Sequence, residues 1–400
     1  MSLKNGEYTF QELFFSRTDL AGKIISGNNV FQRVSVYGWG ELIGRPHNII
    51  RHEDMPRAVF YLFWDIIKQQ KPVAAYVKNK AKDGAFYWVF ALALPIDGGY
   101  VSIRFKPSTE IMKIVCNLYA DLLVDERVSK VQPKAGVEKI LTALKGLGFD
   151  SYEDFMRFAL MKELDNRDFN LGIKNNESMI ANLESLLEKQ KVVSDASEKI
   201  FKEYAKNKFI SLNLNIEASH VGERGISLAK VAEQFQKMIE EIQIEIKTFS
   251  GISDEANKAL KENQFLVCAA KLQKEMIDFF ATESRNANVD VKLEADLLNN
   301  LAKSYRDQVE KSLRKTVTMI DQLNKTVESL LGMVNGLEIV RITGKIESAR
   351  GAESLKQFET LLNELKQFVL ILKTGLSEIH QSGVSMSSIS KKILLNMKLL

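Results

Sequence analysis

The residue types that most often carry out chemistry are few and scattered in this chain. The four histidines stand at positions 47, 52, 220 and 380, and the two cysteines, Cys116 and Cys268, lie in unrelated apolar stretches. We find no nucleophile paired with a base, no glycine-rich phosphate loop and no cluster with metal-ligand spacing. The pattern predicts a binding or signalling protein and not an enzyme.

Polar and aromatic side chains gather in one short segment. The run 51–56, Arg-His-Glu-Asp-Met-Pro, is followed by Phe60 and Trp64 at helical spacing. An acidic residue before a helical proline is a common helix start, so His52 and Asp54 could cap a helix instead of binding a ligand. Phe60 and Trp64 could likewise be plain core residues of that helix. A binding role and a structural role both stay open from these residues alone.

The elements around this segment differ from those in the rest of the chain. Two β-rich runs, 73–77 and 86–94, flank Lys-Asp-Gly at 82–84, which is a hairpin turn signal. No proline follows Pro133, so long helices are free to form there. A compact α+β domain ending near Pro107 is expected, followed by helices.

Beyond residue 170, apolar residues recur at alternating three- and four-residue steps, the pattern of a coiled-coil seam. Breaks near Gly222 and Gly351 divide this region into two helical hairpins. Shifting the first by 130 positions lays Phe235 on Leu365 and indicates an internal duplication. The seams contain Leu183, Leu186, Val193, Ile200, Leu228, Val231, Phe235 and Ile242 in the first hairpin, and Leu313, Ile320, Leu323, Val327, Leu362, Leu365, Val369 and Leu372 in the second.

A lone hairpin leaves apolar surface exposed to water, so the two hairpins are predicted to dock within the chain. The result is an intramolecular four-helix bundle of 170–251 with 301–385, both turns lying at one end. The segment between them should be helical and run back along the bundle. The alternative is a homodimer, in which each hairpin pairs with its copy in a second chain.

The predicted fold class is α+β, with an antiparallel sheet and helices at the N-terminus and a long all-α region of helical hairpins after it. The predicted boundaries are 1–107 for the N-terminal domain, 108–169 for a helical connector, 170–253 for the first hairpin, 254–300 for a second connector, and 301–400 for the second hairpin and tail.

The segment 44–56, Gly-Arg-Pro-His-Asn-Ile-Ile-Arg-His-Glu-Asp-Met-Pro, closely resembles the PAS domain of bacterial aerotaxis receptors. The later runs 77–80 and 87–89 match as well, and the likeness covers roughly residues 10–107. In that family the domain binds FAD without a covalent bond, and the flavin reports on oxygen or respiratory state. The resemblance implies a FAD pocket formed by Asn28, Arg51, His52, Asp54, Phe60, Trp64, Asn79 and Trp88.

The residue types in this motif are compatible with a flavin. An isoalloxazine ring needs an aromatic-lined slot and a few polar groups, and Arg51 and His52 could hold pyrophosphate or ribose. His47 lies inside the matched motif, which disfavours a haem-ligand role. Glu53 replaces the proline usual in the family, and 72–75 lacks its Pro-Trp-x-Gly. A PAS domain without cofactor, acting as a scaffold with a coiled-coil assembly role, is therefore kept as the alternative.

Two runs in the helical region, 212–225 and 228–233, look like a degenerate signalling tip of methyl-accepting chemotaxis proteins. In that family the tip binds the chemotaxis histidine kinase and its coupling protein. The resemblance implies a partner site here, and no clear methylation site accompanies it. The residues implied to contact the partner are Glu217, His220, Glu223 and Arg224.

Composition limits the possible partners. The chain has 55 basic and 51 acidic residues, a formal net charge of +4, and the two signs are interspersed, which argues against nucleic acid. Its apolar runs are far shorter than the ~20 residues that span a bilayer, so any membrane link should come through a membrane receptor partner. We expect a cytoplasmic sensor of redox, oxygen or energy state that signals by protein contact.

Overall fold

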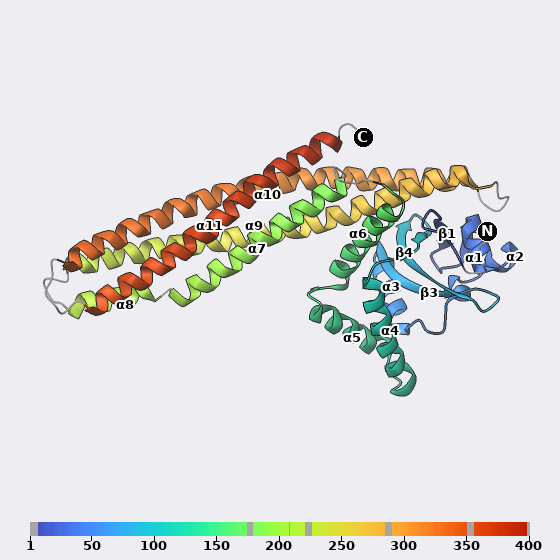
Figure 1. Cartoon of the computed structure of the whole chain (residues 1–400), viewed down its shortest axis with the longest axis horizontal. Helices are drawn as coiled ribbons and strands as arrows, with labels where there is room; N and C mark the ends of the chain where they lie inside the picture. The colour runs from blue at the N-terminus through green and yellow to red at the C-terminus, as the bar shows by residue number, and fades with distance from the viewer. Residues whose placement is uncertain are drawn as a thin grey trace. The chain divides into compact units, whose positions relative to one another are not determined.

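A computed structural model describes residues 7–173, 179–207, 209–220, 226–284, 290–349 and 356–397. The chain divides into two compact units (Figure 1). The first consists of Met1–Ile180 with Lys261–Val309, and the second of Ala181–Leu260 with Glu310–Leu400.

The first unit is built on a five-stranded antiparallel sheet with the strand order β2-β1-β5-β4-β3. Strand β3 pairs with β4 along its whole length, from Val73 opposite Ala93 to Lys80 opposite Phe86, so the predicted hairpin is confirmed. Gly84 has a φ of +91° in its turn, a conformation that glycine adopts without steric cost. The strands are β1 (Phe14–Asp19), β2 (Ile24–Gly27), β3 (Val73–Lys80), β4 (Phe86–Ile96) and β5 (Gly99–Phe105).

One face of this sheet, which we call the inner face, lies toward the helices inserted between β2 and β3. Successive strand residues point to opposite faces. In β1, Ser16 therefore lies on the inner face and Phe15 on the opposite, outer face. The inserted helices are α1 (Asn29–Ser35), α2 (Trp39–Leu42), the 3-10 helix η1 (His47–Ile50) and α3 (Arg57–Lys68).

Three helices follow the sheet: α4 (Ile111–Val128), α5 (Pro133–Gly146) and α6 (Tyr152–Asn170). We interpreted this region as a connector, and in the structure it packs on the sheet domain. Glu163 of α6 is fully buried and accepts a hydrogen bond of 2.8 Å from the Tyr76 hydroxyl. Gly136 of α5 lies so close to Ala58 of α3 that a Cβ at residue 136 would fall 2.6 Å from it.

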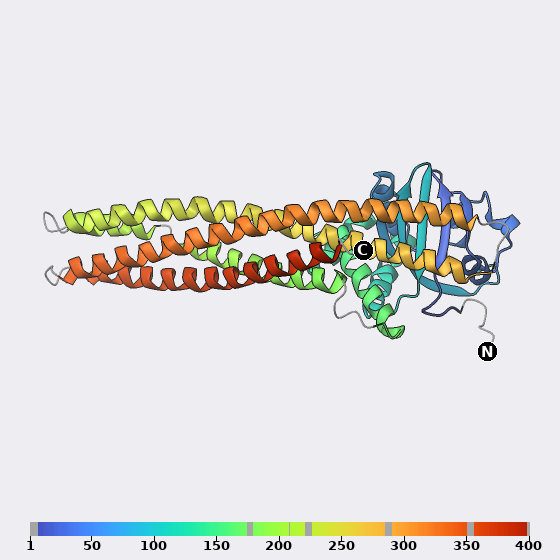
Figure 2. The same cartoon turned by 90° about the horizontal axis from the view of Figure 1, so that it is seen from above.

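The second unit is a four-helix bundle formed within one chain, as predicted. The Gln190 amide donates to Ser253 Oγ at 2.8 Å, Ser387 donates to Asp321 at 3.1 Å, and Gly375 packs against Ile200. Figure 2 shows the helices running lengthwise beside one another. They are α7 (Met179–Asn207) and α8 (Ile210–His220), the first part of α9 (Ile226–Thr282), the later part of α10 (Val291–Ala349), and α11 (Lys356–Met397).

The seam residues named from the sequence are buried, which confirms the heptad interpretation. Two polar residues of α7, Gln190 and Ser197, occupy positions of the same heptad seam and are buried as well. The turns near Gly222 and Gly351 lie outside the described residues. The helices that flank them do meet, because a Cβ at Gly344 would lie 3.1 Å from Val231 and 3.2 Å from Leu362.

The expectation that the segment after the first hairpin returns along the bundle is wrong. The segment is helical, but it forms the end of α9 and the start of α10. Residues 261–309 group with the N-terminal sheet and not with the bundle. Heptad spacing could not reveal this, because it indicates which face of a helix is buried and not what covers it.

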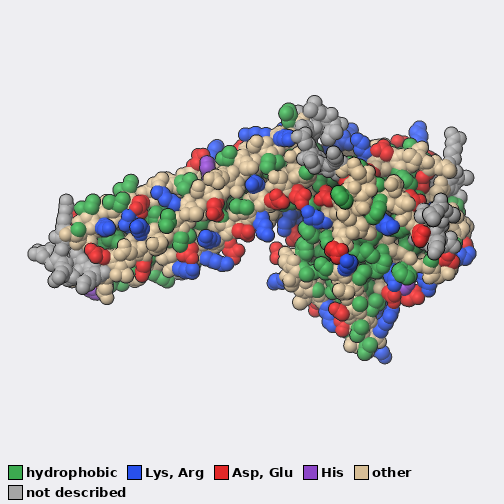
Figure 3. Space-filling model, in the orientation of Figure 1, with side chains coloured by type: hydrophobic (Ala, Val, Ile, Leu, Met, Phe, Trp, Pro, Cys, Tyr) green, Lys and Arg blue, Asp and Glu red, His purple; other side chains and the backbone are tan. Residues whose placement is uncertain are grey.

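Among the described residues, no helix is both long and apolar enough to cross a membrane. On the face shown in Figure 3, acidic and basic side chains of these residues are interspersed along the helices. This mixed surface is the arrangement that the nearly balanced composition predicts.

Candidate functional site

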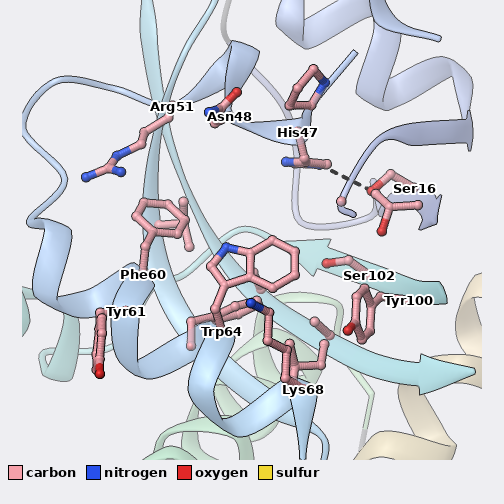
Figure 4. A pocket seen from close by; sticks show the side chains of 18 of the residues that line it. Ser16, His47, Asn48, Arg51, Phe60, Tyr61, Trp64, Lys68, Tyr100 and Ser102 are labelled. Carbon is pink, nitrogen blue, oxygen red and sulfur yellow. Dashed lines mark hydrogen bonds between the residues drawn. The ribbon is translucent and has the colours of Figure 1, made fainter. Parts of the chain in front are cut away.

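A cavity of about 840 Å³ lies between α3 and the inner face of the sheet (Figure 4). Its volume is within the range of ~300–1,000 Å³ that is usual for cofactor and small-molecule sites. The sheet contributes small side chains here, including Ala91, Ala93 and Ser102. Because these side chains are short, they leave the space that larger core residues would fill.

The aromatic wall of the cavity comes mainly from α3. Phe60 and Trp64 are four residues apart, so both lie on the helix face toward the sheet. The Trp64 ring meets Tyr100 of β5 edge to face, with 5.7 Å between ring centroids (Figure 4). The guanidinium of Arg51 lies 4.4 Å from the centroid of the Phe60 ring. An aromatic slot with a cation at one edge results.

A polar corner closes another side of the cavity. Arg104 of β5 lies 2.9 Å from Ser16 Oγ and 2.7 Å from His47 Nε2 through its Nη2 atom. Burial lowers the pKa of His47 well below its usual value, with the nearby Arg104 charge as a second cause, so the imidazole is neutral at neutral pH. The dashed line in Figure 4 marks the 3.3 Å contact between Ser16 and His47.

Arg104 is a cavity residue that our sequence reasoning missed. It is 5% exposed, and its Nη1 atom has no hydrogen-bond partner. Burial lowers its pKa to about 10, which still leaves the guanidinium charged at neutral pH. A buried cation with unused donors is ready to bind an oxygen-rich group of a ligand. Strand alternation was the available signal, because Tyr100, Ser102 and Arg104 share one face of β5.

Four of the eight predicted cofactor residues line the cavity together: Arg51, Phe60, Trp64 and Asn79. A backbone bridge between Arg51 and Asn79 ties the loop before α3 to β3. The Arg51 guanidinium also donates to the Met55 carbonyl at 2.7 Å, which fixes its direction at the cavity wall.

Two of the other predicted residues have clear structural surroundings elsewhere. Trp88 lies on the outer face of the sheet, because side chains alternate along β4 and its cavity-facing residues are Ala91 and Ala93. The Trp88 ring stacks on Tyr119, with 6.2 Å between ring centroids. Asn28 is the N-cap of α1, and its Oδ1 accepts from the backbone N–H of Phe31 and Phe15.

His52 and Asp54 also lie outside the cavity lining. The His52 Nδ1 atom accepts from the Asp54 backbone N–H at 3.0 Å. Hydrogen bonds from Lys78 and Arg127 lower the pKa of Asp54 to about 2, so Asp54 links β3 to α4 as a carboxylate. Neither side chain caps α3, whose N-cap residue, Pro56, makes no side-chain cap bond. A cofactor role for any of the eight residues stays a prediction.

Two of the four predicted partner residues fall at the end of α8. Glu217 and His220 are on this helix, with His220 Nδ1 3.9 Å from the Glu217 carboxylate and its side chain exposed. Glu223 and Arg224 lie outside the described residues. A partner-binding role for the four residues is likewise still a prediction. Within the described part of the chain, no group of three or more His, Cys, Asp or Glu side chains is placed to hold a metal ion.

The N-terminal domain is a PAS domain: residues 24–104 match the family model described as the PAS fold. The aerotaxis receptor of Escherichia coli (strain K12) is 43% identical over 112 residues. These residues make up 27% of this chain and 22% of the receptor, so the chain spans about a fifth of that relative. The long helical hairpins agree with the resemblance to a chemoreceptor signalling region.

Solved PAS and LOV domains are similar to about a quarter of the chain. The LOV domain of the photoreceptor aureochrome1 is 21% identical, with a TM-score of 0.24, and the match covers 26% of this chain and 88% of that one. A PAS domain from Colwellia psychrerythraea is 22% identical, with a TM-score of 0.21 and coverages of 25% and 87%. The LOV domain of a blue-light-activated histidine kinase from Erythrobacter litoralis is 22% identical, with a TM-score of 0.20 and coverages of 23% and 90%.

Proposed function

We propose that this chain is a non-enzymatic sensory protein of the aerotaxis type, whose PAS domain binds FAD in the cavity beneath α3. Redox change of the flavin would report oxygen, redox or energy state, and the helical region would pass the signal on by protein contact. The observation that carries the proposal is the cavity itself. It combines an aromatic slot with a half-buried and a buried arginine, Arg51 and Arg104, in a chain that is 43% identical to an aerotaxis receptor over 112 residues.

The aromatic wall and the polar corner of the cavity suit different parts of a flavin. Phe60 and Trp64 offer flat apolar surface against which an isoalloxazine ring can be buried. Arg51 stands at the same wall and is a natural partner for a phosphate. Arg104, with Ser16 and His47, offers hydrogen bonds to the polar edge of a ring. When bound, the flavin supplies the redox chemistry, and these residues supply its position and surroundings.

An absorption spectrum of the full-length protein tests this proposal. Protein purified from a flavin-replete host, or incubated with FAD and with FMN, should show flavin absorbance. Trp64→Ala and Arg51→Ala should weaken binding by about 5- to 150-fold, because each removes a contact of roughly 1–3 kcal/mol.

Trp88→Ala is the matched control, because it removes the same side chain from the opposite face of the sheet. It should retain the flavin. Protein that carries no flavin and binds none on reconstitution would exclude the proposal and leave the cofactor-free scaffold as the function. Equal loss from both tryptophan variants would show that binding does not occur in this cavity.

For the output, we propose that the end of the bundle at Glu217 and His220 contacts a chemotaxis histidine kinase or its coupling protein. The exposure of His220 supports this. Replacing both residues by alanine should reduce capture of the purified kinase or coupling protein. Glu198→Ala is a matched control, because Glu198 is an exposed α7 residue whose ion pair with Lys202 lies within one helix. Unchanged capture in the double variant would exclude this end as the contact site.

A further inference from the structure

The outer face of the PAS sheet is in contact with residues 261–309 of the same chain. Glu294 of α10 is 1% exposed and accepts hydrogen bonds of 2.9 Å from Arg17 and 2.6 Å from Ser26. Beside it, Phe280 of α9 meets Phe15 edge to face, with 5.1 Å between ring centroids. The helices over this face are visible in yellow and orange in Figure 2. A buried ion pair and an aromatic contact therefore hold this segment to β1 and β2.

A second contact lies at the start of α1. Glu283, just after the end of α9, accepts from the Asn28 amide at 3.0 Å and from the Val30 backbone N–H at 3.4 Å. The Asn29 amide donates to the Ser284 carbonyl at 2.8 Å. Three successive residues of the PAS domain thus bind the two residues that follow this helix.

Asn28 connects Glu283 to β1 and α1 of the PAS domain. Its Oδ1 accepts from the backbone N–H of Phe15 at 2.9 Å and of Phe31 at 3.2 Å, while its Nδ2 donates to Leu13 and Glu283. The side chain is buried, and both of its polar atoms are bonded. A shift of α1 or β1 must therefore move the group that holds Glu283.

Asn28 is connected to the cavity through Phe31 and His47. The Phe31 ring stacks on His47, with centroids 5.7 Å apart and planes 12° from parallel. His47 lines the cavity and contacts Arg104. The route His47, Phe31, Asn28, Glu283 is a continuous series of packed or hydrogen-bonded groups, the kind of connection that carries coupling between sites.

We propose that residues 261–309 are the output element of the PAS domain and that Asn28 is the positioning residue that couples the cavity to them through Glu283. The proposal rests on the proposed function for the identity of the ligand. Helices α9 and α10 each continue in sequence into the bundle unit, so a change at this contact has a covalent path to it. Burial raises the pKa of Glu283 to about 7, with Glu12 adding to the shift, and a carboxyl so placed holds its partners less firmly than a freely ionised one.

The first test needs no flavin and uses hydrogen exchange of the full-length protein. Coupling is reciprocal, so a change at either end must appear at the other. His47→Leu should speed exchange of residues 279–284 and 291–300 about tenfold, the loss of roughly one hydrogen bond. Glu283→Ala should do the same for residues 28–34 and 47–51. Glu53→Ala, which removes an exposed ion pair with Lys80, is the control and should change neither region.

The second test uses flavin-loaded protein before and after reduction with dithionite. In the natural sequence, reduction should change exchange of residues 291–300 at least about threefold, well within the range that local opening equilibria span. Glu283→Ala should keep the flavin absorbance, and both Glu283→Ala and Asn28→Ala should lose this response. Flavin binding without any redox-dependent change at 291–300 would overturn the proposal, as would an unchanged redox response in Glu283→Ala. If no flavin binds, the proposed function fails, and the first test alone decides the coupling: exchange effects confined to the mutated side would overturn it.

Discussion

The indole ring of Trp64 lies directly over the α-carbon of Gly22. A Cβ at residue 22 would fall 2.9 Å from the ring, and the glycine has a φ of +75°, so only glycine allows both the backbone turn and the position of the ring. Gly22→Ala should therefore displace Trp64 and lower flavin affinity about tenfold or more. The measurement is flavin titration followed by absorbance.

Gly84→Ala is the control for this change. Gly84 also has a positive φ, of +91°, but nothing lies within 4 Å of the position its Cβ would take. Both variants carry a similar backbone cost of about 1–2 kcal/mol in unfolding free energy. Affinity that falls equally in both would mean that general destabilisation, and not the displaced ring, is responsible.

Glu126 on α4 should stabilise the helix that carries the aromatic wall. Its carboxylate accepts from the backbone N–H of Arg57 at 2.9 Å and of Ala58 at 3.0 Å, and so caps α3 from another helix. Glu126→Ala should lower the free energy of unfolding by about 1–2 kcal/mol, the usual value of a lost cap. Urea unfolding measures it. Glu110→Ala should cost close to nothing, because the Glu110 side chain precedes the same helix without making a cap hydrogen bond and has only an exposed Lys113 partner.

The cap at Glu126 illustrates what the sequence could not predict. His52 and Asp54 were the plausible caps because they precede α3 in sequence. The actual cap is 68 residues away from Ala58, and no local pattern indicates it. By contrast, the hairpin at Gly84 and the heptad seams were predictable, because turn conformation and side-chain periodicity are local properties.

The candidate site likewise has residues whose position the sequence could predict and residues whose position it could not. Phe60 and Trp64 share a helix face, so their convergence follows from spacing alone. Asn28 matched the aerotaxis motif equally well, but its side chain is used by the backbone of α1 and β1 and by Glu283. A motif match identifies a position, and only the packing shows whether its side chain turns toward the cavity or away from it.

The buried pair Gln190 and Ser253 should specify the pairing of α7 with α9 at a cost in stability. The Gln190 Nε2 atom donates to Ser253, while its Oε1 atom is buried without a partner. Replacing both residues, as Gln190→Leu with Ser253→Ala, should be neutral or raise the free energy of unfolding by about 1 kcal/mol. Ser253→Ala alone should destabilise, because it leaves the amide less satisfied. Thermal unfolding of the three variants checks this, and a double variant less stable than Ser253→Ala would contradict it.

The contact at Glu283 predicts how stability depends on pH. Burial raises the pKa of this carboxyl from 4.5 in the unfolded chain to about 7 in the folded one, so between these values the folded state binds more protons. The contribution of Glu283 is then fully present below pH 4.5 and is lost as pH rises toward 7. The carboxyl faces the Asn28 amide, the Val30 backbone N–H and the more distant Glu12 carboxylate.

The titration of His47 changes stability with pH in the opposite direction to that of Glu283. The measurement must therefore separate the two groups. The pKa of His47 falls on folding, so its contribution is lost as pH drops below about 6.5, the value of the free side chain. The two effects overlap in pH. The difference in unfolding free energy between the natural protein and Glu283→Gln reports the Glu283 carboxyl alone, because glutamine has nearly the same size and does not titrate. Urea unfolding from pH 5 to pH 8 should show the natural protein losing stability relative to Glu283→Gln as pH rises, with the difference levelling off above pH 7 to 8. A difference that is constant across this range would show that Glu283 is not protonated in the folded protein.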